Sequence, residues 1–124
     1  MPQTWCIYHI NNCRHARPIP KPKFVAIVCY DIRYMGFLIN SNIHPYIQQR
    51  SYLLVGQAVI DVADHQFLNN NSYADCNEIY EFEDFELNTG NFRGIIGANA
   101  RAEIKKAVSL SRMIAPRYKK LILV

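Results

Sequence analysis

The sequence contains no long apolar run and comparatively few charged residues. Half of its 124 residues are apolar, yet no continuous apolar stretch approaches the roughly 18 residues that a membrane-spanning helix needs. Charged residues make up only 19% of the chain, which is typical of a folded globular protein rather than a disordered one. We therefore expect no membrane span, and the chain length predicts a single domain over residues 1–124.

The N-terminal stretch lacks the features of a secretory signal. MPQTWCIYHINN has neither a positively charged start nor a long apolar region behind it. We therefore expect a cytoplasmic protein. In that compartment cysteines are kept reduced, so free thiols are expected at Cys6, Cys13, Cys29 and Cys76.

Several motifs with known chemistry are also missing. The sequence has no P-loop, no GxGxxG, no HExxH and no GxSxG pattern. Nucleotide-binding folds and the common hydrolase classes therefore receive no support from motifs.

Lys and Arg are missing from one part of the chain, and acids are scarce in another. Residues 61–86 carry eight Asp and Glu, whereas residues 87–124 carry eight Lys and Arg with Glu103 as the one acid. This segregation predicts one acidic and one basic face, and a basic face suits a polyanion such as RNA or DNA. Alternatively, the two regions neutralise each other within the fold.

Strands are predicted by apolar runs in the first half of the chain. FVAIVCY at residues 24–30 is continuously apolar, which is typical of a central strand covered on both faces. A turn and MGFLIN at residues 35–40 follow, so the two runs predict a hairpin. Residues 11–23 hold three prolines and predict a loop. Further strands are predicted at residues 4–10, 52–62, 73–82 and 85–92.

The periodicity changes near the C-terminus. ANARAEIKKAVSLSRMIA places apolar residues three or four apart, which predicts an amphipathic helix over residues 98–115. Asn99 is the expected N-cap, Glu103 suits the first turn, and Pro116 ends the helix. YKKLILV follows as a tail that could add a final strand. Strands followed by one helix predict an α+β fold, most simply a small β-barrel over residues 4–92 with this helix packed on it.

Four potential zinc ligands lie close together near the N-terminus. Cys6, His9, Cys13 and His15 are all residue types that bind zinc. Structural zinc sites usually draw their ligand pairs from two separate turns, and these four lie within ten residues. Cys6 and His9 also point to opposite faces if they belong to one strand. We therefore expect no metal site, and a zinc-stabilised binding domain remains the disfavoured alternative.

The basic stretch RHARPIPKPK is the strongest candidate for chemistry. His15, Arg17, Lys21 and Lys23 lie within nine residues without a carboxylate. Arg and Lys can bind phosphate, His can transfer protons near neutral pH, and the prolines can hold the loop in one direction. The stretch could therefore bind and cleave a phosphodiester, or it could be a solvated basic loop. Ser41, at the end of GFLINS, could contact a phosphate or cap a turn.

The passage from PKPKFVAIV to GFLINS resembles the MazF/PemK-like toxins. In that family a basic loop leads into an aliphatic strand, and a later strand ends near an active-site Ser or Thr. The resemblance implies a small SH3-like barrel that acts as a metal-independent endoribonuclease. It covers residues 4–114 in the order of their elements.

The resemblance also implies site residues. Arg17 or Lys23 would stabilise the phosphate or the transition state, and Ser41 would contact the scissile phosphate. We assign Arg17, Ser41 and His15 as the catalytic set, with His15 included for its proton-transfer chemistry. Cleavage of single-stranded RNA would leave a 2′,3′-cyclic phosphate and a 5′-hydroxyl without metal or cofactor. The substrate-binding residues would be Lys21, Lys23, Arg14 and Asn40.

Partners and one other function class follow from the same observations. The expected partners are RNA, an antitoxin or another protein, and a second copy of the chain in a homodimer. The acidic residues 61–86 suit a protein partner better than RNA. The alternative is a non-catalytic protein- or nucleic-acid-binding module of a phage or mobile element, such as an inhibitor of host defence, because small barrels host many functions.

Overall fold

Three long strands from the first third of the chain form the centre of the fold. The structure, a computed structural model, describes residues 2–124. FVAIVCY lies within β2 (Lys21–Asp31), which folds back as the antiparallel β3 (Arg33–Asn40). This confirms the predicted hairpin. β1 (Cys6–Cys13) pairs with the other side of β2, so the first strand continues three residues into the stretch predicted as a loop.

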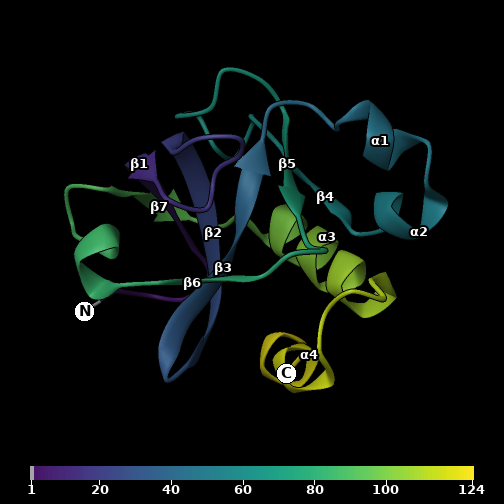
Figure 1. Cartoon of the computed structure of the whole chain (residues 1–124). Helices are drawn as coiled ribbons and strands as arrows, with labels where there is room; N and C mark the ends of the chain where they lie inside the picture. Colours follow the sequence, from purple (N-terminus) through teal and green to yellow (C-terminus); the bar gives the residue numbers. More distant parts are fainter. Residues whose placement is uncertain (1) are drawn as a thin grey trace.

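The strands form one curled antiparallel sheet (Figure 1). Its order is β4-β5-β3-β2-β1-β7, and β6 also pairs with β3, next to the β2–β3 turn. β4 and β7 therefore lie at the two ends, and the sheet has the form of a half-barrel. With its helices the chain is an α+β protein, as predicted. The remaining strands are β4 (Gln57–Ile60), β5 (Ser72–Asp75), β6 (Tyr80–Phe82) and β7 (Phe92–Ile95).

Both faces of the central strands are buried. One face packs against α3 (Ala98–Leu110) and α4 (Pro116–Ile122). The other face is covered by the loop after β1, by β6 and by the 3-10 turn η1 (Asp84–Leu87). Val25–Cys29 are buried without interruption, which confirms that this run is covered on both faces. The continuous apolar run correctly indicated a strand buried on both faces, because alternating apolar and polar residues are typical of strands with one solvent-exposed face.

The C-terminal helix begins at residue 98, as predicted, but its N-cap residue and its C-terminal end differ from the prediction. α3 has Gly97 as its N-cap, Asn99 lies inside the helix, and no acid occupies the first turn. The helix ends before Ser111, whose buried hydroxyl donates to Asn77 Oδ1 (2.9 Å) and accepts from the Met113 N–H (3.2 Å). These bonds hold Ser111 in extended backbone and stop the helix there.

The C-terminal tail is a helix rather than a strand. Pro116 occupies the first turn of α4, a position that suits proline because its missing N–H needs no partner there. Lys119 reaches back from α4 and donates to the carbonyls of Ser109 (3.3 Å) and Ser111 (2.6 Å). It thereby satisfies acceptors that the end of α3 leaves open.

The predicted strand over residues 52–62 is only partly correct. Its first part forms the short helix α2 (Ser51–Leu54), which follows another short helix, α1 (Pro45–Gln48), along the chain. Only β4 is extended. Gly56 lies between α2 and β4, where an added Cβ would come within 2.1 Å of Asn77 Oδ1. The Asn77 amide donates to the Leu53 carbonyl (2.7 Å) at the end of α2. A contact from more than twenty residues away therefore helps to end the helix.

The acidic part of the chain is also more broken than predicted. Residues 73–82 divide into the end of β5 and β6, and the expected strand over residues 85–92 is largely η1 and a turn. Glu83 and Glu86 form a reciprocal capping box around η1, which explains why a strand does not form there. Within residues 2–124 no helix is both long and apolar enough to span a bilayer.

Candidate functional site

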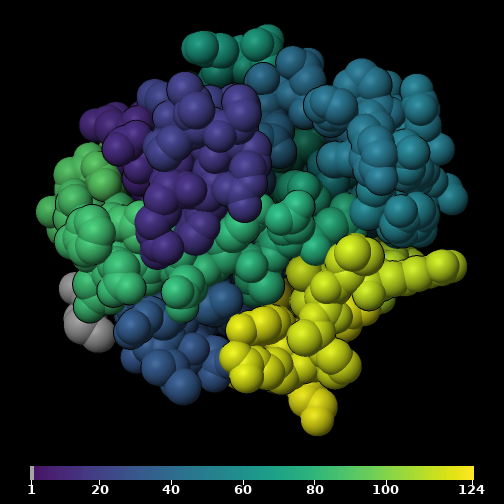
Figure 2. Space-filling view, viewed as in Figure 1, coloured from purple at the N-terminus to yellow at the C-terminus, as the bar shows by residue number. Residues whose placement is uncertain are grey.

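The basic loop after β1 folds onto the acidic segment. The Arg14 guanidinium pairs with Glu86 (Nη2–Oε1 3.2 Å) and donates to the Glu81 carbonyl (3.1 Å). His15 Nε2 lies 2.7 Å from the same carbonyl, and its ring stacks on Tyr80 with 4.5 Å between centroids. Figure 2 shows this loop, in purple, against the green segment. Part of the charge segregation is therefore neutralised within the fold.

This arrangement separates His15 from Ser41. Tyr80, on which His15 stacks, pairs with Gly36 of β3. Ser41 lies five residues further along the chain, which corresponds to roughly 15 Å of extended strand. Arg17 is exposed in the same loop as His15. The structure therefore does not bring the three residues of the predicted catalytic set together at Ser41, and the roles of Arg17 and His15 stay predictions.

A different subset of the predicted residues does meet. Phe24 pairs with Ile39, so Lys23 and Asn40 lie opposite each other on β2 and β3, and Ser41 follows directly. The Lys23 ammonium donates to the Asn40 side-chain oxygen. Lys21 lies two residues earlier on the same strand and is exposed. The Lys23 cleft, defined by Lys23, Asn40 and Ser41, is therefore a product of strand pairing.

The environment of Lys23 is unusual for a lysine. Its side chain is half-buried and forms no ion pair within residues 2–124. Burial, followed by the nearby charge of Lys21, lowers its pKa from 10.5. A cation held away from water without a carboxylate gains from the arrival of an anionic group.

Lys23 contributes to the walls of two hollows. One, of about 260 Å³, has His9 and Ser72 in its wall, and the other, of about 360 Å³, has His44. Lys23 and Ser41 line both. No carboxylate lines either hollow among the residues that the structure describes. The cleft therefore offers positive charge and hydrogen-bond donors to a phosphate group.

The two histidines differ in their hydrogen bonding. Burial, and then the charge of Arg93, lowers the pKa of His9, which favours a neutral imidazole that can accept a proton. His44 Nδ1 accepts a hydrogen bond from the Tyr46 N–H (3.0 Å) and caps α1. The neutral His44 ring therefore carries its proton on Nε2, where it can donate to a ligand.

Sequence reasoning considered His9 only as a zinc ligand and did not consider His44. The available signal for His44 was the sequence His-Pro before a short apolar stretch, where a side chain at the N-cap precedes proline in the first turn. For His9 the placement follows from strand pairing in the structure, which sets it opposite Phe24 near the start of β2.

The four residues weighed for zinc lie in three different environments. Cys6 and Cys13 are buried in the core beneath the loop. His9 lies on the opposite face of β1, with its ring 4.7 Å from that of Phe24, and His15 stacks on Tyr80. Within residues 2–124 no group of three His, Cys, Asp or Glu side chains is placed to hold a metal ion.

Comparison with known proteins gives no family assignment. No protein-family model matches the sequence, and no curated protein matches it.

Proposed function

We propose that the chain is a metal-independent endoribonuclease with an SH3-like barrel of the MazF/PemK type, and that the Lys23 cleft is its phosphate-binding site. The observation that carries the proposal is a half-buried lysine with a lowered pKa that lines two hollows, neither of which is lined by a carboxylate of residues 2–124. The curled antiparallel sheet is consistent with the barrel. The adjacent Ser41 hydroxyl supports contact with a phosphate oxygen.

In this proposal the cleft promotes transesterification of RNA. The 2′-hydroxyl attacks the neighbouring phosphorus, a 2′-oxygen–phosphorus bond forms, and the bond to the 5′-oxygen breaks. His9 takes the proton from the 2′-hydroxyl as a neutral imidazole. Lys23 stabilises the charge on the phosphoryl oxygens and gives a proton to the departing 5′-oxygen, which its lowered pKa favours. The products are a 2′,3′-cyclic phosphate and a 5′-hydroxyl.

The remaining residues of the cleft bind and position in this proposal. Asn40 holds the Lys23 ammonium through its side-chain oxygen. Ser41 and the Nε2–H of His44 donate to phosphate oxygens, and Lys21 and Arg17, both exposed, contact flanking phosphates. Because no step requires a metal, activity is expected in EDTA.

Cleavage of a labelled single-stranded RNA in EDTA tests the proposal. Lys23→Met is expected to lower the rate by about 100-fold or more, because one charge-stabilising donor typically contributes that much. His9→Ala is expected to have a similar effect, and Ser41→Ala a smaller one. The same sequence as DNA should bind without cleavage, since it lacks the 2′-hydroxyl. Mass spectrometry of the fragments checks the expected ends.

Matched variants identify the site. Lys106→Met removes an exposed lysine from α3 and should leave the rate unchanged. His15→Ala and Arg17→Ala test the assignment made from the sequence. Full activity of Lys23→Met would refute the cleft as the catalytic site. RNA binding that depends on Lys23 but never leads to cleavage would instead identify a non-catalytic binding module.

A further inference from the structure

Exposed apolar side chains gather at the far end of the β2–β3 hairpin. Ile32, at the turn, is 79% exposed, Phe85 of η1 is 74% exposed and Tyr30 is 55% exposed. All three line one hollow of about 630 Å³, which the buried Phe82 also lines. We call these four residues, with Asp84, the hairpin-tip surface. Exposed apolar groups gathered in this way are typical of binding surfaces.

The backbone at the tip is strained. Ile32 has a φ of +67°, and a β-branched residue adopts this left-handed conformation only rarely. Glycine or asparagine adopts it more readily. Because the Ile32 side chain is largely exposed, packing within the chain does not offset the strain. A large apolar side chain at this position is explained if it contacts another molecule.

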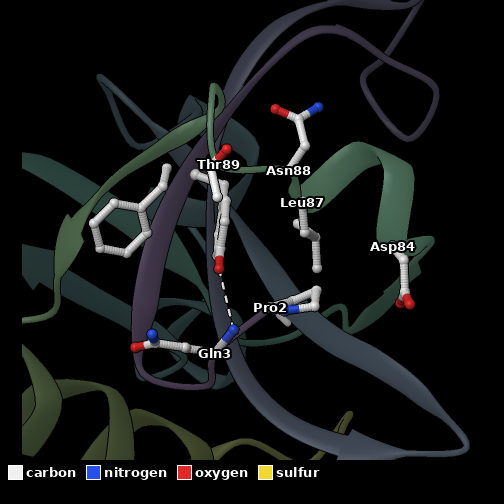
Figure 3. A pocket seen from close by; sticks show the side chains of 8 residues that line it. Pro2, Gln3, Asp84, Leu87, Asn88 and Thr89 are labelled. Atoms are coloured by element: carbon white, nitrogen blue, oxygen red, sulfur yellow. Dashed lines mark hydrogen bonds between the residues drawn. The ribbon is translucent and has the colours of Figure 1, made fainter.

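A second hollow extends the surface on the other side of η1. It measures about 550 Å³ and shares Asp84 with the first. Figure 3 shows the Leu87 side chain pointing toward Pro2, with Asp84 on η1 to one side; all three line this hollow. Tyr8 also lines this hollow, and its hydroxyl accepts a hydrogen bond from the Gln3 N–H (3.1 Å). The second hollow therefore combines apolar walls with a carboxylate at its edge.

The charges around this surface are mainly negative. Glu83 and Asp84 line the first hollow, and Glu81 lies nearby. Three cations lie near these acids, and each is already paired. Arg33 lies 3.9 Å from a Glu81 oxygen and 3.5 Å from a Glu83 oxygen, so it is shared between two acids. Arg14 pairs with Glu86 (3.2 Å), and Arg117 pairs with Asp31 (3.1 Å). Asp84 has no ion pair within residues 2–124. An acidic rim around apolar hollows repels RNA and attracts a cationic partner.

We propose that the hairpin-tip surface docks a basic segment of another protein that carries bulky apolar side chains. The apolar side chains of the segment fill the two hollows, and its Lys or Arg residues pair with Asp84 and Glu83. Lys23 lies near the start of β2 and Ile32 lies in the turn just after its end, nine residues later, which places them about 30 Å apart. The docked segment therefore leaves the Lys23 cleft free, and the proposal holds whether or not the cleft cleaves RNA.

Selection of short random peptides displayed on phage tests this proposal. The immobilised full-length protein is expected to enrich peptides that combine Lys or Arg with Leu, Ile or Phe. Enriched peptides, synthesised with a fluorophore, should lose affinity about tenfold or more on Phe85→Ser and Ile32→Asn. Asp84→Asn should weaken binding and reduce its dependence on salt. Ile32→Asn should also raise the melting temperature, because asparagine tolerates the left-handed backbone.

The control is Ile95→Asn, since Ile95 is 70% exposed on β7 and lines neither hollow. It should bind the enriched peptides as the wild type does. The proposal would be refuted if the tip variants bound the enriched peptides as tightly as the wild type. It would also be refuted if acidic peptides were enriched, or if no peptide were enriched at all. Sedimentation of the free protein is expected to show no association through the tip. A dimer that dissociates on Phe85→Ser would instead identify a second copy of the chain as the occupant, and would overturn the proposal.

Discussion

Asn77 connects three separate parts of the chain, and its removal is expected to destabilise the fold. The residue is 6% exposed, and its amide donates to the Leu53 carbonyl at the end of α2. Its oxygen accepts from the Ser111 hydroxyl at the end of α3. Asn77→Ala removes both bonds and leaves the Ser111 hydroxyl, 1% exposed, without its acceptor.

The size of the effect follows from these contacts. The lost bond to Leu53 accounts for about 1 kcal/mol, and the orphaned hydroxyl of Ser111 for about 1–3 kcal/mol. The free energy of unfolding should therefore fall by about 2–4 kcal/mol, a drop of roughly 10 °C in melting temperature for a chain of this size. Asn12→Ala, on the exposed side of β1, should change it by less than about 0.5 kcal/mol.

Urea unfolding, followed by the fluorescence of the single tryptophan, measures these differences. Ser111→Ala should lower stability on its own, because the Asn77 oxygen then loses its donor. The double variant should lose less than the sum of the two, since the orphaned hydroxyl is then also gone. Additive losses, or an Asn77→Ala variant as stable as Asn12→Ala, would refute the reasoning.

Two further predictions concern buried ionisable groups. Burial, with a smaller contribution from Asp31, raises the pKa of Cys29 from 9.0 to about 11. The thiol therefore ionises in the unfolded chain before it ionises in the folded protein, so the free energy of unfolding falls as the pH rises from 9.0 to about 11. In urea titrations, the free energy of unfolding of the wild type should therefore fall by roughly 2–3 kcal/mol more than that of Cys29→Ala over this pH range. Equal decreases in the two proteins would contradict the pKa shift. Arg14→Ala leaves the Glu86 carboxylate, 7% exposed, with the Glu83 N–H as its remaining donor. It should lower the urea-derived stability by about 1–2 kcal/mol, and an unchanged midpoint would show that Arg14 is dispensable.

The parts of the fold that the sequence predicts correctly depend on local pattern. The apolar run over residues 24–30 and its return over residues 35–40 contain enough information for the hairpin, because pairing them buries both. The errors lie where a distant residue decides the local structure. Asn77 influences the ends of both α2 and α3 through bonds to Leu53 and Ser111, and no pattern near those ends contains this information.

The candidate site divides in the same way. Lys23, Asn40 and Ser41 meet because the predicted hairpin aligns them, so residue type and strand pairing suffice. His15 has suitable chemistry for catalysis, yet it stacks on Tyr80, from the acidic region far along the chain. Whether a basic loop faces a ligand or an acidic segment of its own chain depends on tertiary packing, and the sequence alone left both alternatives open.

The burial of β2 on both faces makes this strand a rigid connection between its two ends. Val25–Cys29 are covered on each side, so their amides should be among the slowest to exchange with solvent and should open only when the whole domain unfolds. The strand therefore acts as a stiff spacer between the Lys23 cleft and the hairpin tip. A partner held at the tip would determine where the chain resides and how often it meets a nucleic acid, while the shape of the cleft stays the same.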